Sequence, residues 1–264
     1  MKKLSLLLSS ILLLLIVSGC SPKEEPNNKA ETLKQKVELT VSAAASLQDA
    51  LNDIKTDFEK KYANVKINYN FGGSGALQQQ ISQGAPVDLF LSAAEDKFEH
   101  LVKDGLIEKE SGTNLVGNEL VLVVPKNSNK EIQTFEDLPK ADKIAVGIPE
   151  SVPAGQYAKE TLKQMHIWNA VDKKLVFAKD VRQVLTYVET NNVDAGVVYK
   201  TDALSSQKVR IAAIAGDKTH APIIYPAGVI KDSAHPKEAQ QFFKFLQSKE
   251  SLKTLEKYGF KGLH

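Results

Sequence analysis

From Val37 onward, short apolar runs alternate with longer segments in which apolar residues recur every three or four positions. The first pattern predicts β-strands and the second predicts amphipathic helices. The strands are expected at Val37–Val41, Val65–Asn70, Leu89–Ser92, Leu120–Pro125, Lys143–Ile148, Leu175–Phe177, Ala195–Tyr199 and Ile223–Ile230. The helices are expected at Leu47–Tyr62, Ala76–Gln83, Glu95–Asp104, Gly155–Met165, Val181–Thr190, Pro236–Leu246 and Glu250–Tyr258. This alternation predicts an α/β fold with mostly parallel sheets.

Two apolar segments divide this part of the chain into portions of ordinary domain size. Asn118–Lys126 and Ile223–Ile230 are each expected to cross between two lobes, which would give a hinge of two connections. Lobe 1 then comprises residues 36–120 and 226–264, and lobe 2 comprises residues 121–225. Ligands of such sheets bind beyond the carboxyl ends of the strands, where the helices begin.

The N-terminal residues follow a different pattern. Lys2 and Lys3 precede the apolar run Leu4–Val17, which leads into Cys20. A basic region, a short apolar core and a small-residue site predict an export signal over residues 1–19. The sequence around Cys20 resembles a bacterial lipobox, which implies cleavage just before Cys20 and lipid attachment to it. We therefore expect export and anchoring to the outer face of the cell membrane through Cys20.

A signal anchor, or a secreted protein with an incidental cysteine, is the alternative. The apolar run is shorter than the ~20 residues that a bilayer crossing needs, which argues against an anchor. Residues 20–35 are polar and contain two prolines, so they predict a flexible tether.

Charge and cysteine content narrow the function classes. The chain has 34 basic and 32 acidic residues, and loss of Lys2 and Lys3 with the signal leaves equal numbers. This balance, with only Arg182 and Arg210 as arginines, argues against a nucleic-acid partner. Cys20 is the only cysteine, and the five histidines do not occur at metal-ligand spacing, so we expect neither a disulfide nor a metal site.

One local pattern occurs four times: an apolar strand, a turn of small residues and a helix start. It is found at Val37–Leu51, Val65–Ile81, Asp142–Leu162 and Leu175–Val188. The first turn of a helix carries unpaired N–H groups and about half a positive charge, so it attracts anions. The repetition predicts a site for a small anion that is built without cationic side chains.

The turns contain two candidate serines. Ser46 stands where a helix N-cap is expected, and a plain capping role is the alternative to ligand binding. Ser74 lies in the turn Gly72–Gly75, whose glycines permit positive φ and could expose amides to an anion. This turn approaches the G-x-S-x-G motif of serine hydrolases, with Ala76 in place of the last glycine, and the chain offers no convincing base. A hydrolase that uses Ser74 is therefore kept as the enzymatic alternative.

The second half contributes backbone donors and a tyrosine. Pro153 suits the first turn of a helix, which leaves the amide of Ala154 free, and Asp180 is expected to cap the helix that begins at Val181. Tyr199 closes a strand, so its phenol is expected at the same rim or at the edge of the core. Arg182 is either an anion ligand or part of an ion pair.

Several segments together resemble the periplasmic molybdate-binding proteins of ABC importers, which have the type II solute-binding fold. The resemblance covers residues 37–260, and its most distinctive segments are GAPVDLFLSA at Gly84–Ala93 and VPAGQYAKE at Val152–Glu160. The other segments are AAASLQDAL, FGGSGALQQQI, PESVPAGQYAKETL, DVRQVL, AGVVYKTDA and KYGF. The resemblance implies a two-lobe protein with helices flanking each sheet.

The resemblance also implies the ligand set and the role. It assigns the oxyanion ligands to Ser46, Ser74, Ala154, Val181 and Tyr199, and it implies that Arg182 is not a ligand. The implied protein is a monomer without catalytic residues or a cofactor. It binds molybdate or tungstate and delivers it to a membrane permease driven by an ATPase.

Five donors without a carboxylate suit a fully deprotonated dianion, because a protonated phosphate would leave donors facing a donor. Sulfate, thiosulfate, phosphate and an organic acid are the alternative ligands.

Overall fold

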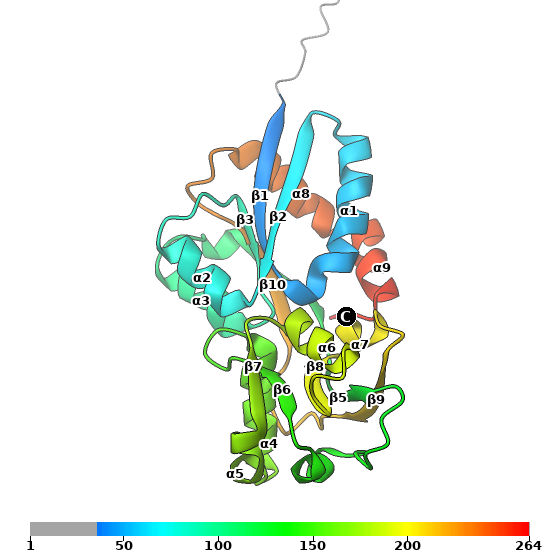
Figure 1. Ribbon diagram of the computed structural model, residues 1–264. Helices are drawn as coiled ribbons and strands as arrows, with labels where there is room; N and C mark the ends of the chain where they lie inside the picture. Colours follow the sequence, from blue (N-terminus) through cyan, green and yellow to red (C-terminus); the bar gives the residue numbers. More distant parts are fainter. Residues whose placement is uncertain (1–35, 264) are drawn as a thin grey trace, which may run out of the picture. The chain divides into compact units, whose positions relative to one another are not determined.

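The structure, a computed structural model, describes residues 36–263, so the expected signal, the tether and Cys20 lie outside the described residues. The described part contains two five-stranded sheets with the orders β2-β1-β3-β10-β4 and β7-β6-β8-β5-β9 (Figure 1). The strands are β1 Val37–Ala44, β2 Val65–Gly72, β3 Leu89–Leu91, β4 Gly112–Gly117, β5 Leu120–Pro125, β6 Ile144–Gly147, β7 Leu175–Ala178, β8 Ala195–Tyr199, β9 Val209–Ile214 and β10 Ile224–Val229.

Helices flank both sheets (Figure 1). They are α1 Gln48–Lys61, α2 Ser74–Ser82, α3 Glu95–Lys103, α4 Pro153–Gln164, α5 Trp168–Val171, α6 Val181–Glu189, α7 Lys200–Leu204, α8 Pro236–Leu246 and α9 Lys249–Lys257. In the first sheet's layer, α1, α8 and α9 pack against one another, and α2 packs against α3. Around the second sheet, α4 and α6 contact β6 and β8, and α7 contacts β5. Within residues 36–263 no helix is both long and apolar enough to cross a membrane.

The predicted α/β class with two sheets is confirmed, but the expectation of mostly parallel strands is wrong. β1 is parallel to β2 and β3, and β6 is parallel to β7 and β8. By contrast, β10 is antiparallel to β3 and β4, and β5 is antiparallel to β8 and β9. Parallel neighbours require a long crossover, usually a helix, whereas β5 and β10 enter their sheets directly from the other sheet.

The chain passes between the two sheets twice in the described residues. Asn118 and Glu119 join β4 to β5, and residues 215–223 join β9 to β10. The strands Leu120–Pro125 and Ile224–Val229 each belong to a single sheet, so the apolar runs predicted to cross share only Asn118–Glu119 and Ile223 with the segments that do cross. The boundaries of the two lobes stay a prediction.

The strands that the sequence did not predict, β4 and β9, lie at sheet edges. β4 is buried only in its second half and β9 only at Val209, whereas every residue of the more central β3, β5, β6 and β8 is buried. Strands covered on both faces appear as continuous apolar runs, while edge strands do not. The unpredicted helices α5 and α7 have four and five residues, too few to show a helical period.

Candidate functional site

A small cavity lies where the carboxyl ends of β1, β2 and β8 meet the first turns of α2, α4 and α6. Its lining residues are Ala44, Ala45, Ser46, Gly72, Gly73, Ser74, Ala93, Val152, Pro153, Ala154, Val181 and Tyr199. The cavity therefore brings together all five residues predicted from the sequence, which are Ser46, Ser74, Ala154, Val181 and Tyr199. None of these lining residues is acidic, basic or a histidine.

Two helix starts of the second sheet supply backbone donors. Ala154 is the second residue of α4, after Pro153, and Val181 is the first residue of α6. A first-turn amide has no partner within its own helix, and among residues 36–263 neither of these amides donates to another atom. The predicted cap of α6 is confirmed, since Asp180 Oδ1 accepts from the Gln183 amide at 2.8 Å. Both helices thus direct partial positive charge toward the cavity.

Ser74 supplies a hydroxyl from the first sheet. It is the first residue of α2, its exposed fraction is 0 %, and its Oγ accepts from the Ala93 amide at 2.9 Å. Because the Ala93 amide can only donate, the Ser74 proton is left for another acceptor. Ser74 can therefore donate to a molecule in the cavity.

The capping role considered for Ser46 is wrong. Ser46 lies inside the short 3₁₀ turn Ala45–Leu47, and Leu47 occupies the N-cap position of α1. Its hydroxyl instead lies 2.9 Å from the phenol oxygen of Tyr225. Tyr225 carries no sequence signal that links it to Ser46, because it lies 179 positions away in an otherwise apolar strand.

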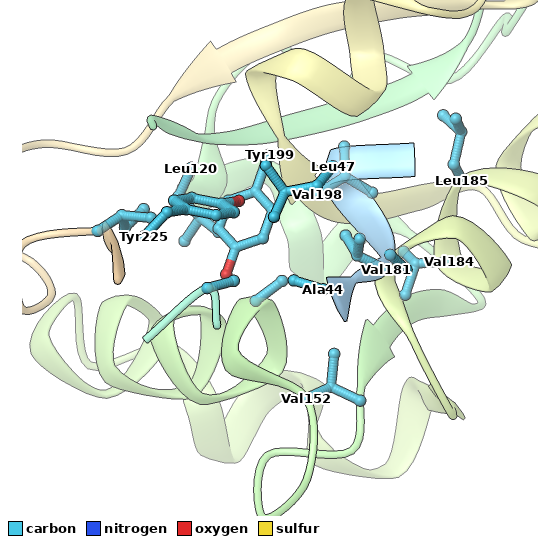
Figure 2. Close-up of a cluster of buried hydrophobic side chains, with 14 of the residues drawn as sticks. Ala44, Leu47, Leu120, Val152, Val181, Val184, Leu185, Val198, Tyr199 and Tyr225 are labelled. Atoms are coloured by element: carbon cyan, nitrogen blue, oxygen red, sulfur yellow. The ribbon is translucent and has the colours of Figure 1, made fainter. Parts of the chain in front are cut away.

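Tyr199 has the least ordinary surroundings of the five. It closes β8, is 1 % exposed, and within the described part of the chain its hydroxyl has no hydrogen-bond partner. Burial raises the pKa of Tyr199 well above its usual value of 10, so the phenol keeps its proton. A buried unpaired donor costs about 1–3 kcal/mol. Figure 2 shows the ring of Tyr199 beside Tyr225, in the region of Ala44, Val152 and Val181, which line the cavity.

The glycines of the turn Gly72–Gly75 allow another part of the backbone to approach closely, and none of them has a positive φ. Within the described residues, the glycines with positive φ are Gly84, Gly105 and Gly259, which corrects the expectation for Gly72–Gly75. The Gly75 amide donates to Ser151 O at 3.0 Å, across from the first sheet's α2 to the loop before α4. A Cβ at Gly75 would lie 2.9 Å from Ser151 Cα, and one at Gly73 would lie 2.7 Å from Ser151 O.

Arg182 is part of an ion-pair group and does not line the cavity. Its guanidinium contacts Asp49 of α1, its Nε lies 3.0 Å from Asp202 Oδ1, and its Nη1 donates to Ser205 Oγ at 2.9 Å. Burial raises the pKa of Asp202 to about 7, against the opposing effect of Arg182. The ion-pair alternative predicted for Arg182 is confirmed.

Comparison with known proteins identifies the family. Residues 39–261 match the family described as bacterial extracellular solute-binding protein. The chain belongs to this family. It is 55 % identical over 259 residues to a putative ABC transporter substrate-binding lipoprotein, YvgL, of Bacillus subtilis, with 98 % of each chain covered.

Two further members carry more specific names. The molybdate-binding protein ModA of Haemophilus influenzae is 37 % identical, with 84 % of this chain and 89 % of the relative covered. A solved structure described as the substrate-binding domain of a putative molybdenum ABC transporter from Clostridium difficile is 42 % identical. It matches with a TM-score of 0.66 and covers 87 % of this chain and 100 % of its own.

Solute-binding proteins of ABC transporters bind without catalysis, so the chain is a binding protein and not an enzyme.

Proposed function

We propose that this protein binds molybdate, and also tungstate, in the cavity between the two sheets and delivers it to a membrane permease driven by an ATPase. The observation that carries the proposal is the set of donors. Two serine hydroxyls, two first-turn amides and the unpartnered Tyr199 phenol face one cavity whose lining has no carboxylate. The names of the relatives support molybdenum oxyanions as the ligand.

The proposed donor set favours a fully deprotonated tetrahedral dianion. Such an ion accepts every hydrogen bond, whereas an ion that carries a proton places a donor against a donor at a cost of about 1–3 kcal/mol. The positive ends of α4 and α6 offset the ion's charge without a lysine or arginine in the lining. The ligand is bound as such, and no cofactor or metal-cation site is part of the proposal.

Binding is proposed to close the two lobes about the connections at Asn118–Glu119 and residues 215–223. Ser46 and Ser74 come from the first sheet's side, and Ala154, Val181 and Tyr199 from the second. Either lobe alone would then hold an incomplete set of donors. The protein is proposed to act as a monomer, with lobes bounded as the sequence predicts.

Calorimetric titration with molybdate, tungstate, sulfate and phosphate tests the ligand. Molybdate and tungstate are expected to bind tightly, and sulfate and phosphate much more weakly. Sulfate binding as tight as molybdate binding would overturn the assignment to molybdate while leaving an oxyanion site in place.

Replacing Ser46 or Ser74 with alanine tests the site. Each change removes a hydrogen bond to a charged group, so the molybdate affinity is expected to fall by about 1.5–3 kcal/mol. Ser251→Ala is the matched control, because Ser251 is 2 % exposed and its hydroxyl donates to Phe245 O at 2.7 Å in a region outside the cavity lining. Wild-type affinity in both site variants would place the ligand elsewhere.

Anchoring is proposed to depend on Cys20. In the full-length precursor, Cys20→Ala is expected to abolish lipid labelling and to move the protein from the membrane fraction to the soluble exported fraction. Ser21→Ala, at the next position, serves as the control. Membrane retention of the Cys20 variant without label would contradict a lipid anchor.

A further inference from the structure

A chain of buried hydrogen bonds leads from the backbone between the two sheets to the cavity. The Glu119 amide donates to Asn118 Oδ1 at 2.8 Å, and Asn118 Nδ2 lies 3.1 Å from Tyr225 Oη. Tyr225 Oη in turn lies 2.9 Å from Ser46 Oγ. Asn118, Tyr225 and Ser46 are only 7 %, 1 % and 4 % exposed, so water does not readily replace these partners.

The first bond fixes the orientation of the Asn118 amide. A backbone N–H can only donate, so the Asn118 oxygen must face Glu119 and its NH₂ group must face Tyr225 and Thr201 Oγ1, the latter at 2.9 Å. Tyr225 accepts from Asn118, and of the two directions open to its 2.9 Å contact with Ser46 we infer that Tyr225 is the donor. The proton of Ser46 is then left for the cavity.

We propose that Asn118 and Tyr225 are positioning residues that hold Ser46 as a donor, so that the site selects deprotonated oxyanions over protonated ones of equal charge and similar size. The proposal rests on the proposed oxyanion site.

The selection follows from what a protonated anion would require of Ser46. If Ser46 turned its own proton toward Tyr225 in order to accept that proton, the Tyr225 proton would lose Ser46 as its acceptor. A buried unsatisfied donor is penalised, so the chain of bonds resists the reversal. The Ala93 amide holds Ser74 Oγ as an acceptor in the same way, but by a backbone donor that no side-chain change removes.

Replacing the Asn118 NH₂ group with an acceptor should reverse the direction of the hydrogen bonds between Asn118, Tyr225 and Ser46. In Asn118→Asp, a carboxylate of the same shape accepts from Glu119, Thr201 and Tyr225, and three such donors favour its ionised form. Tyr225 then donates to the new carboxylate and accepts from Ser46, so that Ser46 presents a lone pair to the cavity. The site would gain an acceptor without any change in a residue that lines it.

Selenate and hydrogen arsenate are a matched pair of probes at pH 8.5. Both are tetrahedral dianions of similar size, and they differ by one proton. Each is measured by displacement of bound molybdate, so that weak binding is also quantified. The carboxylate in Asn118→Asp should weaken the binding of both anions to a similar extent by Coulombic repulsion. The ratio of selenate affinity to hydrogen arsenate affinity is nevertheless expected to fall at least tenfold.

Three further variants isolate the chain of bonds. Tyr225→Phe is expected to weaken selenate binding about tenfold. In the double variant with Asn118→Asp, the ratio of selenate to hydrogen arsenate affinity should be the same as in Tyr225→Phe alone. Tyr69→Phe is a control that removes another tyrosine hydrogen bond, to Leu51 O at 2.9 Å, and it should keep wild-type affinity. Asn70→Asp adds a carboxylate on β2 and should keep the wild-type ratio.

The outcomes separate this proposal from the proposed function. An unchanged ratio in Asn118→Asp between pH 7.5 and 9.5, or wild-type selenate affinity in Tyr225→Phe, overturns the role of the chain while molybdate binding stands. Failure of the wild-type protein to bind molybdate overturns the proposed function, and with it the premise of this inference.

Discussion

Replacing Gly75 with alanine is expected to weaken molybdate binding by about 5- to 150-fold without destabilising the ligand-free protein. The new Cβ would lie 2.9 Å from Ser151 Cα and 3.1 Å from Glu150 O, both of which belong to the loop before α4. Overpacking of this kind costs about 1–3 kcal/mol, which corresponds to the expected loss of affinity. The cost arises only when α2 contacts the loop before α4. Alanine is also a better helix residue than glycine by about 1 kcal/mol, so the melting temperature without ligand should not fall.

The control is Gly216→Ala, where the nearest atom to a new Cβ, Thr219 Cγ2, is at an ordinary contact distance of 3.6 Å. It should leave both affinity and melting temperature near the wild-type values. If Gly75→Ala bound molybdate as tightly as wild type, contact between Gly75 and Ser151 would not be part of the ligand-bound state. Calorimetry and thermal unfolding, each with and without molybdate, measure the two effects separately.

The second large effect concerns pH and Asp202. Its side chain is 0 % exposed, and burial raises its pKa from the ordinary 3.8 to about 7. Between these values the folded state binds a proton that the unfolded state has released, so stability falls as pH rises from about 4 to about 7 and is level above that. The pKa difference corresponds to a loss of up to about 4 kcal/mol.

Asp202→Asn should remove this part of the pH dependence, because the amide does not titrate. The variant is then expected to be more stable than wild type at pH 8 and to lose that advantage toward pH 4. Urea unfolding at several pH values measures the difference. Asp49→Asn is the control, since Asp49 contacts the same Arg182 but is 38 % exposed. Its charge is a smaller cause of the raised pKa of Asp202 than burial is, so this variant should retain most of the slope between pH 4 and 7. An identical slope in wild type and Asp202→Asn would show that Asp202 does not titrate in this range.

The strands with both faces covered could be predicted from the sequence almost to the residue. Leu120–Pro125 and Ala195–Tyr199 have the predicted bounds, because each is a continuous apolar run between polar residues. The antiparallel direction of β5 in the second sheet and of β10 in the first could not be predicted in this way. Apolar content does not indicate in which direction a strand runs. The direction depends on how the chain passes between the sheets, which is a property of its long-range path.

At the candidate site, the first-turn amides and Tyr199 could be predicted because local signals mark them. Pro153 and Asp180 indicate helix starts, and a tyrosine at a strand end indicates a rim. The partners of the two serines could not be predicted, because Ala93 and Tyr225 are distant in the sequence and have no motif of their own. Sequence alone therefore identified which groups face the cavity, but not what orients them.

Two of the five proposed donors, the amides of Ala154 and Val181, belong to the main chain. Any residue except proline carries an N–H, so substitution at these positions can change the bulk around the ligand without removing the bond. Related proteins could then drift in side-chain identity at 154 and 181 and still bind the same ion. A comparison that scores only shared side chains would recognise Ser46, Ser74 and Tyr199 and would underestimate how much of the site is common to them.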